Sequence, residues 1–147
     1  MSKKNSVLIA FSVAIFGLGV MTGKLTQLAS VAEAQSADRV FELRTYTAHP
    51  GRLAELHARF RDHTVELFER HGMTNVVYMA PQDAPLSENT LVYLLAHDSR
   101  DAAEASWAGF RSDPDWQAVA EATRRNGRLV QNVDSVFLDP TDYSGMR

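Results

Sequence analysis

The order of its apolar patterns predicts that this chain forms an α+β domain with the β-α-β-β-α-β arrangement of ferredoxin-like proteins. Between residues 39 and 139, short segments with strand-like alternation are separated by segments whose apolar residues recur at helical spacing. The composition, 45% hydrophobic and 22% charged residues, is typical of a globular protein. A length of 147 residues suffices for one such domain and a leader. We therefore expect an antiparallel four-stranded sheet with two helices on one face.

The first 34 residues are typical of a secretory signal peptide. Lys3 and Lys4 form a positive start, residues 7–23 are an apolar stretch, and small residues precede a predicted cleavage after Ala34. Alternatively, the segment stays uncleaved and residues 7–23 anchor the chain, since they reach about 25 Å as a helix against a membrane core of ~30 Å. In both cases the domain is exported, and we expect it to be periplasmic, secreted or held outside the membrane.

After a linker over residues 35–38, a domain is predicted over residues 39–147. It opens with a strand over residues 39–47, whose side chains alternate between two faces. One face carries Phe41, Leu43 and Thr45, and the other carries Glu42, Arg44 and Tyr46. A turn at His49-Pro50-Gly51 ends the strand.

A helix is predicted over residues 52–70, because its apolar residues recur at steps of three and four. They are Leu53, Leu56, Phe60, Thr64, Leu67 and Phe68. Gly72 suits the left-handed position that ends such a helix. Two strands then follow over residues 75–80 and 90–97, joined by a polar, proline-containing loop, and the second strand is apolar enough to be central.

Two cap signatures predict the second helical region. Ser99 is a good N-cap for one helix, and Asp113-Pro114 is typical of the start of the next. A last strand over residues 132–139 and a tail complete the domain. Trp107, Phe110 and Trp116 fall on the apolar stripes of these helices, where they form core or, alternatively, roof a pocket between helix and sheet.

The predicted fold leaves one sheet face open. That face is expected to show Tyr78 or Val77 and Tyr93 or Val92, which is more apolar surface than a monomer usually exposes. Packing two such sheets face to face would cover it, so we expect a homodimer.

Five motifs in the same order resemble those of the NIPSNAP family, within the dimeric α/β-barrel superfamily. They are Phe41-Glu42-Leu43-Arg44-Thr45-Tyr46 with Pro50-Gly51, His71-Gly72, Pro85-Leu86-Ser87-Glu88-Asn89, Ala105-Ser106-Trp107 with Phe110-Arg111-Ser112-Asp113-Pro114-Asp115-Trp116, and Leu138-Asp139-Pro140-Thr141-Asp142-Tyr143-Ser144. Members of the family often have a histidine and a tryptophan in the third strand, where this chain has Tyr93 and Leu95. The resemblance implies a dimeric barrel and leaves the activity open, because the superfamily includes cofactor-free monooxygenases, haem enzymes and small-molecule binders.

The polar face of the first strand is the leading candidate site. Glu42, Arg44 and Tyr46 share that face. They form either a ligand pocket, in which Arg44 binds an anionic or carbonyl group and Tyr46 donates a hydrogen bond, or an ion pair between two sheets that sets the dimer register. Tyr78 and Tyr93 are added to the predicted ligand-binding set as aromatic strand residues.

His97, at the end of the third strand, is the best candidate for a general base, and Glu42 is the other catalytic candidate. No two histidines stand four residues apart and the chain has no cysteine, so we predict no metal site and no cofactor. The formal charge of −3 gives no reason to expect nucleic-acid binding. Arg124, Arg125 and Arg128 form a small basic cluster near a predicted helix end, where they offset the helix dipole.

Three functions remain open at the level of sequence. The first is binding of a small apolar or aromatic molecule in a pocket lined by Arg44, Tyr46, Tyr78, Tyr93 and His97. The second is a cofactor-independent monooxygenase or isomerase, in which His97 or Glu42 removes a proton and Arg44 stabilises the enolate. The third is an envelope protein-interaction module that binds no small molecule.

Overall fold

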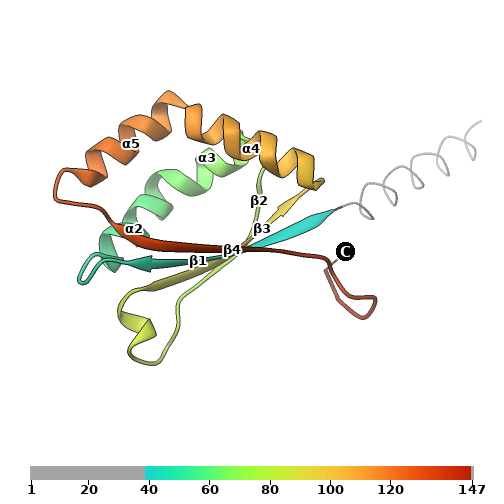
Figure 1. The fold of residues 1–147 in the computed structure, drawn as a ribbon, viewed down its shortest axis with the longest axis horizontal. Helices are drawn as coiled ribbons and strands as arrows, with labels where there is room; N and C mark the ends of the chain where they lie inside the picture. The colour runs from blue at the N-terminus through green and yellow to red at the C-terminus, as the bar shows by residue number, and fades with distance from the viewer. Residues whose placement is uncertain (1–38, 147) are drawn as a thin grey trace, which may run out of the picture. The chain divides into compact units, whose positions relative to one another are not determined.

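Four antiparallel strands form one sheet, in the order β2-β3-β1-β4, in the computed structural model, which describes residues 39–146 (Figure 1). The predicted signal peptide, the anchor alternative and the linker lie outside the described residues. The elements are β1 (Val40–Ala48), α2 (Leu53–Arg59), η1 (Phe60–Thr64), α3 (Val65–Arg70), β2 (Thr74–Met79), η2 (Leu86–Glu88), β3 (Thr90–His97), α4 (Arg100–Ser112), α5 (Pro114–Arg124) and β4 (Val130–Leu138). This is the predicted β-α-β-β-α-β order, and the fold class is confirmed.

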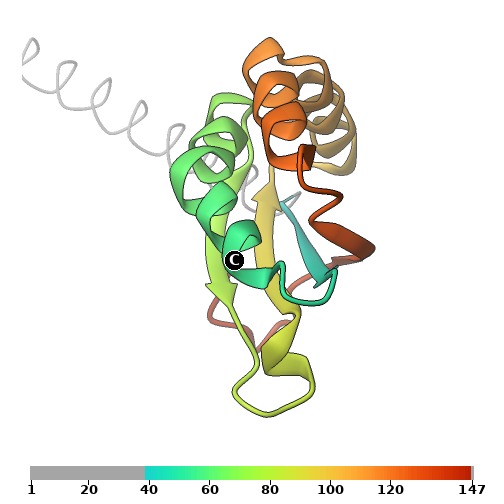
Figure 2. The same cartoon turned by 90° about the vertical axis from the view of Figure 1, so that its left-hand side faces the viewer.

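All the long helices lie over one face of the sheet. Figure 2 shows the α2–α3 segment and the α4–α5 pair side by side on that face. Between them and the sheet lies the larger core cluster, which is rich in aromatic rings such as Phe60, Phe68 and Phe110. We call this the covered face and the opposite one the open face.

Strand register decides which side chains lie on each face. Tyr78 of β2 pairs with Tyr93 of β3, which in turn pairs with Arg44 of β1, and both tyrosines pack in the core under the helices. The alternatives Val77 and Val92 therefore lie on the open face. The alternation of β1 then places Glu42, Arg44 and Tyr46 together on the covered face.

The helix predicted over residues 52–70 contains one wider turn. η1 is a π-helical turn between α2 and α3, and the Thr64 hydroxyl donates a hydrogen bond to the carbonyl oxygen of Arg59 at 3.2 Å. A π-helical turn adds a residue without breaking the helix, so the apolar stripe continues through it and conceals it from sequence analysis.

Both predicted helix caps are present. Ser99 accepts a hydrogen bond from the Ala102 N–H, and Asp113 accepts one from the Asp115 N–H. Asp113 also lies 2.7 Å from Nε2 of His71, so one side chain both starts α5 and joins the α4–α5 pair to the end of α3. Gly109 allows this approach, since a Cβ atom there would stand 2.9 Å from His71 Nδ1.

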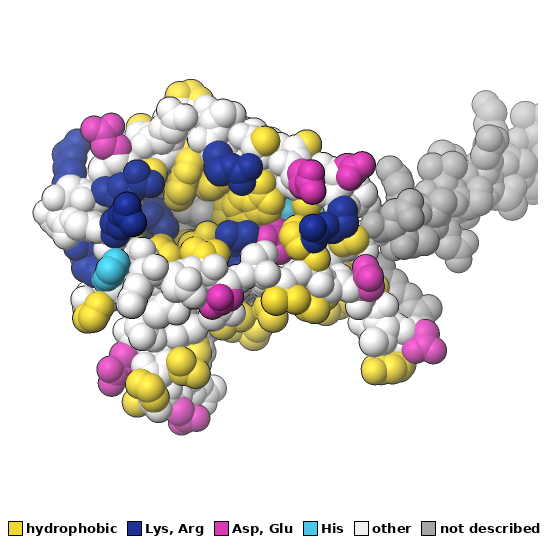
Figure 3. Space-filling view, in the orientation of Figure 1, with side chains coloured by type: hydrophobic (Ala, Val, Ile, Leu, Met, Phe, Trp, Pro, Cys, Tyr) yellow, Lys and Arg dark blue, Asp and Glu magenta, His cyan; other side chains and the backbone are white. Residues whose placement is uncertain are grey.

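The helix layer does not close over the edge strand β4. α5 packs against α2, η1 and α4, whereas β4 packs mainly against β1. The space-filling view shows a hollow between the helices and β4, with hydrophobic and arginine side chains inside (Figure 3). Val133, on the side of β4 that faces the helices, is 39% exposed. Among residues 39–146, no helix is both long and apolar enough to cross a membrane.

The hydroxyl of Thr64 is expected to stabilise the π-helical turn. Thr64→Val keeps the shape but removes the donor to the Arg59 carbonyl, so we expect the free energy of unfolding to fall by about 1 kcal/mol. Thr123→Val is the matched control, because the Thr123 hydroxyl bonds a carbonyl inside the ordinary helix α5. Urea unfolding of both variants checks this, and an equal or larger loss in the control would contradict it.

Candidate functional site

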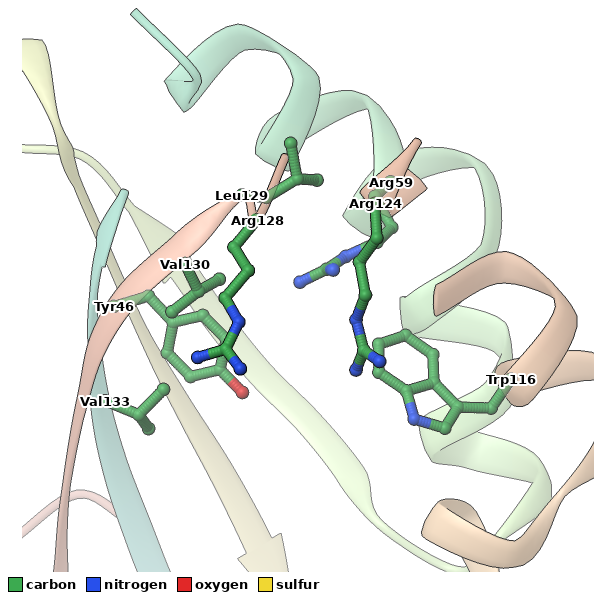
Figure 4. Close-up of a pocket in the computed structure, with 8 residues that line it drawn as sticks. All are labelled: Tyr46, Arg59, Trp116, Arg124, Arg128, Leu129, Val130 and Val133. Atoms are coloured by element: carbon green, nitrogen blue, oxygen red, sulfur yellow. The ribbon is translucent and has the colours of Figure 1, made fainter. Parts of the chain in front are cut away.

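A cavity of about 320 Å³ opens between β4 and α5 on the covered face. Its lining consists of Tyr46, Arg59, Trp116, Arg124, Arg128, Leu129, Val130 and Val133. Figure 4 shows the guanidinium groups of the three arginines and the hydroxyl of Tyr46 turned toward this space. The lining contains no carboxylate, so its formal charge is positive.

Two aromatic side chains form the flat walls of this cavity. Tyr46 stands on β1 and its ring meets those of Phe60 and Tyr93 edge-on, with centroids 5.7 and 5.3 Å away. Trp116 stands on the first turn of α5 and packs against Phe110 at 4.4 Å. Each ring is braced by the core behind it, which gives the cavity preformed walls suited to a flat ligand.

Arg59 is the buried cation of the cavity. It ends α2 directly before the π-helical turn, is only 9% exposed, and its guanidinium lies 5.2 Å from the ring of Trp116. Burial lowers its pKa and the neighbouring Arg124 lowers it further, while the Tyr46 phenol acts in the opposite direction. Its Nε atom has no hydrogen-bond partner within residues 39–146.

A second cation, Arg44, lies on the same covered face but is paired. Its Nη1 donates to a Glu42 carboxylate oxygen, and its guanidinium lies 4.3 Å from the ring of Trp107. Glu42 also accepts hydrogen bonds from Trp107 Nε1 at 2.6 Å, from the Ser135 hydroxyl at 2.6 Å and from His97 Nε2 at 3.1 Å. Burial alone would raise the pKa of Glu42, but these four donors lower it to about 2.

Two further buried groups of this face are incompletely bonded, as Arg44 is at its Nε atom. The hydroxyl of Tyr93 is buried without a hydrogen-bond partner among residues 39–146, and burial raises its pKa well above the usual range. His97 is 1% exposed; its Nε2 is held by Glu42 and its Nδ1 has no partner in the same part of the chain. Tyr93 is fully buried and does not line the cavity, and the groups that act on its hydroxyl are Tyr46 and Arg44, so it supports the Tyr46 wall from behind.

The candidate residues from the sequence do not all meet in one place. Arg44, Tyr46 and Tyr93 lie together on the covered face. Tyr78 lies one strand further away, where its ring stacks on Tyr93 and its hydroxyl donates a hydrogen bond to Asn75. It lines a separate groove beside the π-helical turn, with Phe60 and Val65. The alternative of an ion pair between two sheets is wrong, because the Glu42–Arg44 pair lies under α4 rather than on the open face.

Sequence reasoning missed the cationic half of the cavity. Arg124 and Arg128 line it, besides standing near the C-terminus of α5 as expected. Arg59 was not singled out, although its position three residues after Leu56 on the apolar stripe was a usable indication. Trp116 packs against the core and also forms part of the cavity wall, so the two alternatives given for it, core residue and pocket roof, both hold.

No cluster of metal-ligating side chains is present in the described part of the chain, residues 39–146. The cavity itself offers guanidinium groups, a phenol and aromatic rings. Such an arrangement can hold a flat organic molecule, donate hydrogen bonds to its oxygens and stabilise negative charge on it.

Residues 41–145 match the sequence model of the NIPSNAP family. Among solved structures, a NIPSNAP family protein of unknown function from Agrobacterium tumefaciens aligns with 22% identity and a TM-score of 0.66, over 76% of this chain and 96% of its own. A NIPSNAP-like domain protein from Burkholderia xenovorans aligns with 18% identity and a TM-score of 0.64, over 74% of this chain and 90% of its own.

The same fold occurs in an enzyme. SnoaB, a cofactor-independent oxygenase from Streptomyces nogalater, aligns with 18% identity and a TM-score of 0.51, over 74% of this chain and 99% of its own. At these identities the likeness concerns the fold alone. No curated protein matches the chain.

Glu42→Gln is expected to change the acid stability of the protein. Since the pKa of Glu42 is about 2 in the folded protein against an ordinary value of 4.5, its carboxylate stabilises the fold fully above about pH 4.5 and loses that contribution as the pH falls toward 2. We expect the variant to be about 3 kcal/mol less stable at pH 7 and to lose less stability on acidification than the wild type.

Chemical unfolding across pH 2–7 measures this difference. Glu104→Gln removes an exposed carboxylate from α4 and serves as the control. If the free energy of unfolding falls equally between pH 4.5 and 2 in Glu42→Gln and in the wild type, the Glu42 carboxylate does not provide this stabilisation.

Proposed function

The chain belongs to the NIPSNAP family, and from that premise we propose that its domain binds a small aromatic or apolar molecule in the cavity between β4 and α5. The observation that carries the proposal is the cavity itself, which is open, walled by Tyr46 and Trp116, and bordered by arginines. A sheet face that served only as scaffold would be expected to close over this space with apolar side chains.

The binding surface proposed here continues inward from the cavity. Tyr46 borders the cavity, and Arg44 and the buried Tyr93 lie behind it toward the centre of the sheet. Aromatic walls with a few convergent polar groups are the usual composition of a small-molecule site. Tyr78 supports this surface from behind Tyr93.

An enzymatic role is the alternative, and SnoaB is an oxygenase with the same fold. It would require His97 or Glu42 to take a proton from the substrate. A carboxylate with a pKa of about 2 and four hydrogen-bond donors is a weak base. His97 donates Nε2–H to that carboxylate, which leaves Nδ1 as its basic nitrogen, but His97 is 1% exposed and does not line the cavity. The geometry therefore favours positioning roles for both residues and binding over catalysis.

The third hypothesis, an envelope module without a ligand, would be favoured by a fully packed barrel interior. The open cavity between β4 and α5 supports binding instead, because it leaves space that a ligand can occupy. We further propose that the domain is exported, as residues 1–34 indicate, and that two copies pair through their open faces. Support for the pairing comes from apolar side chains on that face: Leu43 and Val77 are half-buried, and Val136 and Leu138 are 53% and 41% exposed.

Filling the cavity should weaken binding. Val133 borders the cavity from β4, so Val133→Trp is expected to weaken binding of naphthalenemethanol, a neutral flat probe, at least tenfold by occupying its place. Quenching of tryptophan fluorescence or native mass spectrometry measures the affinity. Unchanged affinity in this variant would place the ligand elsewhere.

Charging the open face should separate the dimer. Val136 stands on the same strand as Val133 but on the opposite face, so Val136→Lys is expected to yield monomers that still bind the probe. Native mass spectrometry reads assembly mass and bound probe together. A wild-type protein that is monomeric at micromolar concentration would refute the pairing and leave the cavity proposal standing.

A further inference from the structure

We propose that the part of the cavity around Arg59 is an anion site, which holds the carboxylate of an organic ligand whose aromatic body lies along Tyr46 and Trp116. This inference rests on the proposed function and adds the class of ligand. It assigns a purpose to the buried Arg59 and a second one to Arg124 and Arg128, which also stand near the C-terminus of α5.

The first argument is the uncompensated charge of Arg59. It is nine-tenths buried, no carboxylate lines its cavity, and its Nε atom has no hydrogen-bond partner within residues 39–146. Taking a cation out of water is costly unless it is paired. The contact with the Trp116 ring at 5.2 Å offsets only part of that cost.

Arg44 and Arg59 differ in how their charges are neutralised. Both arginines lie on the covered face and both have an unpartnered Nε atom, yet Arg44 has a carboxylate partner in Glu42, whereas Arg59 has no carboxylate partner among residues 39–146. A guanidinium that served only to cover apolar surface would be expected to extend to solvent or to find an acid. Arg59 instead points into the cavity, as Figure 4 shows.

The backbone holds Arg59 in this position. It is the residue directly before the π-helical turn η1, and its carbonyl accepts the Thr64 hydroxyl. π-helical turns occur frequently at functional sites, because the extra residue re-aims the side chains beside it. Here the residue directly before the turn is Arg59.

Arg124 and Arg128 extend the positive charge to the cavity opening. Both are exposed and both turn toward the same space as Arg59 (Figure 4). Besides burial, the positive charge of Arg124 lowers the pKa of Arg59, so an anion bound among these arginines would relieve a repulsion already present. The Tyr46 hydroxyl, turned toward the same space, adds a neutral donor.

The flat walls indicate an organic anion rather than a free inorganic one. Tyr46 and Trp116 offer ring faces and edges to a ligand, and Val130 and Val133 add apolar contact. A planar guanidinium suits a planar carboxylate, which it can bind through two parallel hydrogen bonds. An aromatic carboxylate matches both halves of the cavity.

The test compares naphthoate with its neutral counterpart naphthalenemethanol, in the full chain and in Arg59→Leu. We expect the wild type to bind naphthoate at least tenfold more tightly than the alcohol. Arg59→Leu should lose that tenfold preference and keep its affinity for the alcohol within about twofold. Because the substitution removes an unpaired buried charge, it should also raise the melting temperature of the ligand-free protein by a few degrees.

Arg125→Leu is the matched control, since it removes the same charge from an exposed position next to Arg124 that does not line the cavity. It should retain the preference for naphthoate. A lower melting temperature in Arg59→Leu together with unchanged naphthoate binding would make Arg59 a structural residue and overturn the inference.

The remaining outcomes distinguish this inference from the proposed function. Equal binding of the two probes to the wild type would refute the anion site and leave the cavity proposal intact. Binding of both probes that Val133→Trp does not change would refute the cavity proposal itself. If inorganic phosphate displaces naphthoate at equal concentration, the site binds small oxyanions, and the proposal that its ligand is an organic carboxylate is overturned.

Discussion

The carboxylate of Glu42 accepts hydrogen bonds from four side chains, and the arrangement of the covered face depends on it. The donors stand on β1, β3, β4 and α4: Arg44, His97, Ser135 and Trp107. One buried charge thus ties three neighbouring strands to the helix layer. Arg44 balances the charge of Glu42, and the carboxylate oxygens all accept hydrogen bonds, so Glu42 can remain ionised under a helix. A carboxylate buried without such partners would cost much free energy of desolvation.

This network also sets where the domain is open. At the Glu42 end the Trp107 hydrogen bond draws α4 toward the sheet. Further from Glu42, α5 packs against α2 and the π-helical turn rather than against β4, and the cavity lies between α5 and β4. The covered face therefore has one end at which the cation, Arg44, is paired with Glu42, and one at which the cation, Arg59, borders the cavity. In the proposed account, Arg44 serves stability and Arg59 serves binding.

Much of this fold could be predicted, because alternation, helical stripes and caps are local properties of the chain. The strands were placed to within two residues, and Ser99 and Asp113 cap the helices as expected. Which face of β1 the helices cover could not be predicted, since the Glu42 face is the more polar one and polar faces usually meet water. Its burial depends on partners that are distant in sequence. Arg59 was missed for a similar reason: a cation on an apolar stripe normally reaches solvent, and only the tertiary packing of Trp116 encloses it.

The most direct test of the central claim is a crystal structure of the protein grown with naphthoate. We expect density for the ring system between Tyr46 and Trp116, with the carboxylate within hydrogen-bond distance of the Arg59 guanidinium. We also expect the Glu42 network to be unchanged, because the ligand adds a counter-charge at the other end of the covered face. A structure in which α5 has closed onto β4, with Arg59 paired to an acid of the chain and no ligand between the rings, would contradict the account.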